Sequence, residues 1–153
     1  MATPEQFARD LNRIVNGIEP NLAAASRRIL GQLLEDVVLG TPVDKGVARS
    51  NWRVSVDSPV TTPIQAYSPG SKLGIGERAN ANAAINAGRV ALRAITPGTL
   101  PSQIFIGNAV GYINDLRRGS SRQQSVDWVE IALTKAAKSF RLTNLLSRGA
   151  NRG

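Results

Sequence analysis

The sequence predicts an α+β domain, in which a small antiparallel sheet packs against several helices, among them a long N-terminal helix and a C-terminal helix. Apolar residues recur at helical spacing over 22–38 and again over 126–140. Residues 51–56 instead alternate between apolar and polar side chains, as a half-buried strand does. Few strands among several helices are typical of the α+β class.

Two helices come first in the chain. Thr3 followed by Pro4 matches an N-cap and the first position of a helix, and Gly17 interrupts the apolar spacing that follows. A longer helix is expected to resume near Asn21 and to end at Gly40. Its wide apolar stripe consists of Leu22, Ile29, Leu30, Leu33, Leu34, Val37 and Val38.

The middle of the chain contains a strand, a long connection and an alanine-rich helix. The strand covers 51–56, with its apolar side chains on one face. Residues 57–76 are rich in proline and glycine, which indicates a long mobile excursion between elements. A helix is expected from Glu77 to Ile95. One side of it consists of Ala81, Ile85, Gly88, Leu92 and Ile95.

The C-terminal part continues with a short strand and a last helix. The strand at 103–106 is expected to pair with 51–56, and the arginine-rich segment 117–124 is expected to be a loop. The last helix then presents an apolar face of Val126, Val129, Leu133, Ala136 and Phe140. We assign 1–146 to a single α+β domain and 147–153, which lacks apolar periodicity, to a flexible basic tail.

Composition excludes several classes of chemistry. The chain has no cysteine and no histidine, which removes disulfides, Cys/His zinc sites and nucleophiles activated by histidine. Only 5% of its residues are aromatic, which leaves little scope for platforms that stack single-stranded bases. No apolar run approaches the roughly 20 residues that span a bilayer. The N-terminal segment carries acids early and lacks an unbroken apolar stretch, so it fits neither a secretory signal nor a transit peptide, and we expect a soluble protein.

The positive charge is concentrated near the C-terminus. Residues 1–116 hold 11 Lys and Arg against 9 Asp and Glu, a net charge of +2, whereas residues 117–153 hold 8 against 2, a net charge of +6. Such a skew is typical of contact with a polyanion, either nucleic acid or an acidic protein surface. A solubilising surface explains it as well.

Two stretches invite a catalytic or nucleotide-binding interpretation. The glycine-rich segment 68–78 resembles a phosphate loop, but it lacks both Gly-Lys-Ser/Thr and GxGxxG, which favours a flexible loop. Glu35, Asp36 and Asp44 are candidate paired carboxylates. Glu35 and Asp36 point to different sides of the helix because they are adjacent, so surface or interface charges fit better. We therefore expect no enzyme activity, no cofactor and no metal.

The tryptophans and arginines carry the remaining expectations. Trp52 lies on the apolar face of its strand and is expected to be core. Trp128 lies beside the apolar face of the last helix, where an aromatic side chain can fill a pocket of a partner. The arginines at 117, 118, 122, 141, 148 and 152 are suited to neutralise phosphates without reading base sequence, because no groove-reading motif is present.

Two motifs resemble a known family. The first is TPVDKGVARSNW at 41–52, and the second comprises GN at 107–108, YINDL at 112–116 and GSSRQ at 119–123. In this order they resemble the tail-completion and head–tail joining proteins of tailed double-stranded DNA bacteriophages, the neck-protein family that includes the minor tail protein Z group. The resemblance covers roughly residues 30–140.

The resemblance implies a virion structural protein at the neck, assembled in the host cytoplasm. Identical subunits would form a six-fold or twelve-fold ring through heterologous contacts, between the DNA-filled head and the tail. The neighbours would be connector, adaptor and tail proteins, with no membrane partner. Loops 57–76 and 117–124 are expected to contact adjacent rings.

The first motif has a physical interpretation as a joint between helix and sheet. Pro42 stops the helix, Asp44 accepts backbone N–H bonds in the turn, and Gly46 supplies a conformation open to few other residues. Trp52 anchors the new strand in the core. The subunit or ring interface is expected at Tyr112, Leu116, Arg117, Arg118, Arg122 and Trp128. Contacts with lumen DNA or an acidic partner are expected at Arg141, Arg148 and Arg152.

An alternative from a different class is a non-specific DNA-binding protein that uses its basic C-terminal third. It predicts an affinity for duplex DNA that falls steeply with salt, which the neck hypothesis does not require. A carboxylate-based hydrolase is the third hypothesis, and no pair of acids at useful spacing favours it.

Overall fold

The computed structural model describes residues 23–42, 46–69, 75–96, 101, 103–120 and 127–150. Within them the fold is α+β, as predicted, with a long helix near the start, a two-stranded antiparallel sheet and a C-terminal helix. In chain order the elements are α2 (Ala23–Gly40), α3 (Val47–Ser50), β1 (Trp52–Val56), α4 (Ile75–Leu92), β2 (Ile104–Asn108), α5 (Ile113–Asp115), the π-helical turn η2 (Leu116–Ser120) and α6 (Trp128–Ala150).

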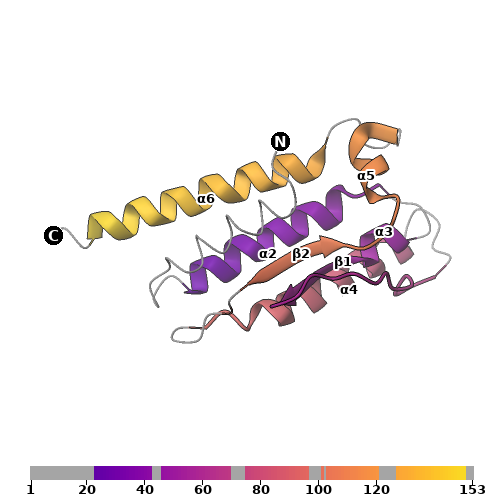
Figure 1. The fold of residues 1–153 in the computed structure, drawn as a ribbon, viewed down its shortest axis with the longest axis horizontal. Coiled ribbons are helices and arrows are strands. Elements are labelled where there is room, and N and C mark those ends of the chain that lie inside the picture. Colours follow the sequence, from indigo (N-terminus) through magenta and orange to yellow (C-terminus); the bar gives the residue numbers. More distant parts are fainter. Residues whose placement is uncertain are drawn as a thin grey trace.

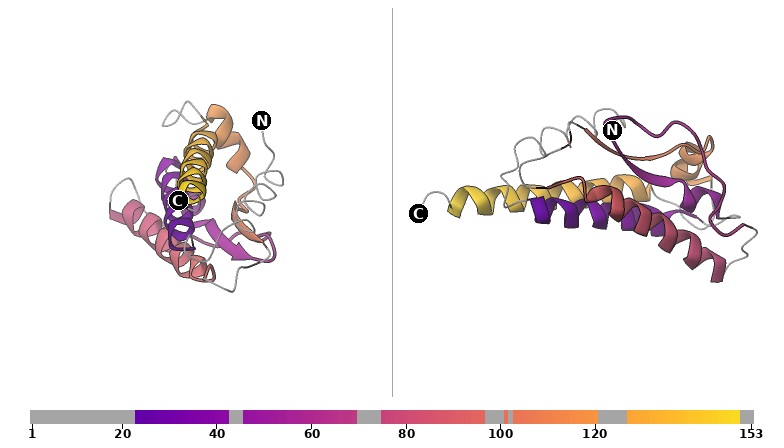
Figure 2. Two further views of the ribbon diagram at one scale, coloured as in Figure 1. Left: turned by 90° about the vertical axis from the view of Figure 1, so that its left-hand side faces the viewer. Right: turned by 90° about the horizontal axis from the view of Figure 1, so that it is seen from below.

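Helix α2 is the centre of the fold. It packs against α6 on one side and α4 on another, so it lies between these two helices (Figures 1 and 2). The described part of its predicted apolar stripe is buried throughout, including Leu30, Leu34 and Val38. A stripe this wide has to be covered from two directions, because a helix contacts one neighbour over only part of its circumference.

The sheet consists of β1 and β2 in antiparallel pairing, as predicted. The register runs from Trp52 opposite Asn108 to Val56 opposite Ile104. Trp52 and Ile104 are buried, and Val54 packs against the same core, so one face of the sheet is turned inward. Helix α4 packs against β1 of this sheet (Figure 1).

Helix α4 confirms the predicted buried side of the alanine-rich segment. Ala81, Ile85, Gly88, Leu92 and Ile95 are all buried. The regular helix ends at Leu92, and the backbone then tightens into a turn in which each N–H bonds the carbonyl three residues back, up to Ile95.

Several predicted boundaries differ from the structure, and two short helices were not predicted. Leu116–Ser120 forms a π-helical turn where a loop was expected from 117 onward. Helix α6 begins at Trp128 and continues to Ala150, so it includes part of the segment expected to be a flexible tail. The short helices α3 and α5 were not predicted, because a single turn carries no periodicity to detect. The helix expected after Thr3 lies outside the described residues.

No helix among the described residues is both long and apolar enough to cross a membrane.

Candidate functional site

The C-terminal end of α2 is the point at which the fold is joined together. Thr41 Oγ1 donates a hydrogen bond to the Val37 carbonyl at 2.6 Å and accepts one from Trp52 Nε1 at 2.7 Å. Trp128 Nε1 donates to the same Val37 carbonyl at 3.0 Å. The last carbonyls of a helix lack partners within the helix, so these donors satisfy a group that would otherwise be buried without one.

Arg49 also binds carbonyl groups at the C-terminal end of α2 and so helps to cap this helix. Its Nε donates to the Thr41 carbonyl at 2.9 Å and its Nη2 to the Leu39 carbonyl at 3.2 Å. The remaining Nη1 pairs with Glu77 Oε1 at 2.9 Å, and the Arg49 side chain is only 11% exposed. A cation at a helix C-terminus is favoured by the helix dipole, and the ion pair extends the contact to α4.

Gly46 makes the turn that brings Arg49 to this position. Its φ angle of 75° lies in the left-handed region, and it is the residue directly before α3. Side chains with a Cβ are disfavoured there, so the prediction for Gly46 is confirmed. Pro42 is buried at the end of α2 and Trp52 is 6% exposed, as the joint interpretation expects. Asp44 lies outside the described residues.

Two buried asparagines hold the connection that follows β1. Asn51 Nδ2 donates to the Ile64 carbonyl at 2.8 Å, while Asn51 Oδ1 accepts from the Ile64 N–H at 2.7 Å. Asn80 makes the same pair of bonds with the backbone of Ser68, at 2.7 and 3.1 Å. Residues 57–69 contain no helix or strand, but their backbone is fixed at two points. The predicted excursion without helix or strand is confirmed for these residues, and its mobility stays a prediction.

The second motif meets the first across the sheet. Trp52 is the Cα partner of Asn108 in the ladder. Asn108 Nδ2 donates to the Ala48 carbonyl at 2.8 Å, and its Oδ1 accepts from the Val110 N–H at 3.1 Å. Two stretches more than fifty residues apart thus form one structural unit with α3.

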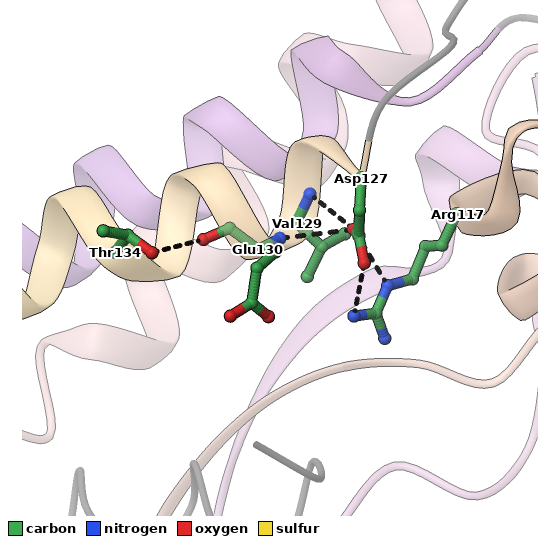
Figure 3. A network of polar contacts seen from close by, with 5 residues as sticks. All are labelled: Arg117, Asp127, Val129, Glu130 and Thr134. Atoms are coloured by element: carbon green, nitrogen blue, oxygen red, sulfur yellow. Dashed lines mark hydrogen bonds and ion pairs between the residues drawn. The ribbon is translucent and has the colours of Figure 1, made fainter. Parts of the chain in front are cut away.

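Asp127 links the end of the second motif to α6 (Figure 3). Its Oδ1 accepts from the N–H groups of Val129 at 3.1 Å and Glu130 at 3.2 Å, which makes it the N-cap of the helix. Arg117 donates to both carboxylate oxygens, from Nε at 3.2 Å and from Nη2 at 3.0 Å. Both side chains are about one-fifth exposed, at 19% and 22%. The pair fixes where α6 begins relative to η2.

The predicted interface residues separate into two groups. Tyr112 and Arg118 are exposed at the corner made by α5 and η2, with 79% of the Arg118 side chain accessible. Leu116 packs against the core and Arg117 binds Asp127 within the chain. Arg122 lies outside the described residues.

The expectation that Trp128 fills a pocket of a partner is wrong. Its side chain is 4% exposed and lies in the core of its own chain. A Cβ at Gly40 would come within 2.4 Å of Trp128 Cδ1, so the indole occupies the space that this glycine leaves free. The side chain of Trp128 points inward because α6 packs on α2. The sequence pattern of α6 alone does not predict that contact.

The candidate DNA contacts are described only in part. Arg141 is exposed on α6, Arg148 lies within the same helix, and Arg152 lies outside the described residues. Glu35 and Asp36, expected to be surface or interface charges, connect helices of the same chain. Glu35 pairs with Arg89 of α4 at 2.6 Å, and Asp36 pairs with Lys135 of α6 at 3.4 Å.

A second basic surface was missed by sequence analysis. Arg27 and Arg28 of α2 lie next to Arg89 of α4 and Arg93 in the turn after α4, around a cavity of about 380 Å³. The spacing of Arg89 and Arg93 by four residues was a usable signal, because such residues share one helix face. The pairing of that face with α2 was not visible in the sequence.

No family model, curated protein or solved structure matches this chain. Functional inference therefore depends on the geometry and on the motif resemblance. Among the described residues, no three Asp or Glu side chains are grouped to hold a metal ion.

Proposed function

We propose that the protein is a structural subunit of a bacteriophage neck, which forms a ring and joins the DNA-filled head to the tail or completes the tail. One observation carries the proposal. The two motifs that resemble the neck-protein family are paired through Trp52 and Asn108, so the resemblance falls on one connected unit of the fold.

The chemistry of this unit supports a structural role. Its polar side chains, Arg49, Asn51 and Asn108 among them, bond backbone groups of the same chain. Such bonds fix the angle between α2 and the sheet, and subunit shape decides whether heterologous contacts close into a ring. A six-fold or twelve-fold ring needs this angle to be the same in every subunit.

The exposed corner at α5 and η2 is the proposed contact with a neighbouring subunit or ring. It lies at one end of the long axis of the molecule, and the C-terminal end of α6 lies at the other (Figure 1). Tyr112 is 43% exposed, and Arg118, which pairs with Asp115 at 3.9 Å, is also exposed. Tyrosine and arginine are among the residue types enriched at interface hot spots. The expected neighbours are connector or adaptor proteins and tail proteins.

The proposal is tested in the phage genome that encodes the chain, with a stop codon at Trp52. Electron microscopy of the lysate should find DNA-filled heads and tails that remain separate, and plasmid-borne wild-type protein should restore complete particles. Normal virions without the protein would contradict the proposal.

A surface variant separates folding from joining. Tyr112→Ala combined with Arg118→Glu should leave the far-ultraviolet circular dichroism and the melting temperature unchanged, since both side chains are exposed. The variant should nevertheless fail to restore joining. Arg78→Glu, an exposed charge reversal on α4, is the matched control and should restore it. Full complementation by the double variant would remove this corner from the interface.

A further inference from the structure

The cavity between α2 and α4 is strongly basic, and we call it the arginine groove. It is lined by Arg27, Arg28, Gly31, Gln32, Arg89, Leu92 and Arg93, and its volume is about 380 Å³. The two helices that form it are packed side by side (Figure 2).

The charge in the arginine groove is not balanced within the described part of the chain. Arg89 pairs with Glu35, and Arg27 Nη1 donates to the Ile95 carbonyl, which is uncharged. Arg28 and Arg93 are exposed, and neither has an ion pair with a described carboxylate. Four arginines therefore line the groove and one of them is paired with a carboxylate, and this excess of positive charge favours an anionic ligand.

The kind of anion follows from what else lines the groove. A docked acidic peptide needs an apolar anchor site, but Leu92 is only 2% exposed and Gly31 and Gln32 offer none. A phosphodiester backbone needs only positive charge and donors, and the planar guanidinium fork matches phosphate oxygens. The arginines come from α2, from α4 and from the turn after α4, so they offer several separate donors to a phosphate backbone.

We propose that the arginine groove binds the phosphate backbone of duplex DNA without reading its sequence. The arginine groove lies outside the C-terminal third of the chain. The charge distribution of the sequence had predicted a polyanion contact within that third. The inference does not rest on the neck proposal, and either can fail without the other.

The test measures fluorescence anisotropy of a labelled duplex at salt concentrations between about 50 and 200 mM. The variant Arg28→Gln with Arg93→Gln removes the two unpaired cations. Its expected effect is weaker binding and a loss of about 2 from the slope of log affinity against log salt, since each phosphate contact contributes about 1. Arg78→Gln with Lys138→Gln removes the same charge from exposed positions on α4 and α6 outside the groove and should keep the wild-type slope.

Four further measurements complete the test. Arg28→Lys with Arg93→Lys keeps the charge and should keep the salt slope, and a second duplex of unrelated sequence should bind equally well. An unchanged affinity in the groove variant, or an equal loss in the control variant with Arg78→Gln and Lys138→Gln, would overturn the proposal. Labelled polyglutamate that binds more tightly than duplex, and only when the groove is intact, would instead assign the groove to an acidic protein surface. The melting temperature of each variant verifies its folding.

Discussion

The indole nitrogens of Trp52 and Trp128 are tied to one backbone carbonyl, that of Val37. Trp128 Nε1 donates to it directly at 3.0 Å, and Trp52 Nε1 reaches it through the Thr41 hydroxyl, with distances of 2.7 and 2.6 Å. Trp52 belongs to β1 and Trp128 to α6. The sheet and the C-terminal helix are therefore both positioned against the same turn of α2.

Loss of the Thr41 hydroxyl should destabilise the protein. Thr41→Val leaves the buried Trp52 N–H without its acceptor, which costs about 1 to 3 kcal/mol in the free energy of unfolding. Urea denaturation, monitored by tryptophan fluorescence, measures this loss of stability. Thr41→Ser keeps the oxygen and should lose less. A valine variant as stable as the wild type would mean that the hydroxyl bridge contributes nothing.

A methyl group at Gly40 should disrupt the packing of α6 on α2. Gly40→Ala places a carbon 2.4 Å from Trp128 Cδ1, and overpacking of this kind costs about 1 to 3 kcal/mol. The matched control is Gly107→Ala, where no atom lies within 4 Å of the added carbon. Thermal melting should separate the two variants, and equal melting temperatures would refute the close approach of Trp128.

Arg49 should not be replaceable by lysine. Its guanidinium donates to two carbonyls and to Glu77 from three different nitrogens, which one ammonium group cannot reproduce. Arg49→Lys should lower the free energy of unfolding by about 1 to 3 kcal/mol, in the range for hydrogen bonds to charged groups. Arg78→Lys, an exposed exchange next to Glu77, should change it little. Similar chemical denaturation midpoints for the two variants would argue against the cap.

The connection after β1 should become dynamic when its amide anchor is removed. Asn80→Ala deletes the bonds to both backbone groups of Ser68, so the Ser68 N–H should exchange with deuterium faster than in the wild type. Asn82→Ala changes an exposed amide on the same helix and should leave the exchange rate unaltered. If Ser68 remains protected in the Asn80 variant, another contact holds this segment.

The parts of the fold that sequence predicted correctly are those with repeated local signals. The stripe of α2 and the buried side of α4 repeat at helical spacing over many residues, and β1 alternates. Gly46 was predictable because few residues other than glycine tolerate its backbone conformation.

What sequence did not predict depends on contacts between distant elements. Trp128 looked peripheral because its contact partners, Gly40 and Val37, lie in another helix. Asn51 and Asn80 look like ordinary surface residues, and only burial turns them into anchors for a loop. The arginine groove likewise exists only because α2 and α4 are neighbours.

Electron cryomicroscopy of the intact virion tests the neck hypothesis most directly. The hypothesis predicts a ring of identical subunits at the junction of head and tail whose density fits α2, α6 and the β1–β2 sheet, with Tyr112 and Arg118 at a contact between subunits or rings. A neck ring of unrelated fold, with this chain elsewhere in the particle or absent from it, would contradict the account.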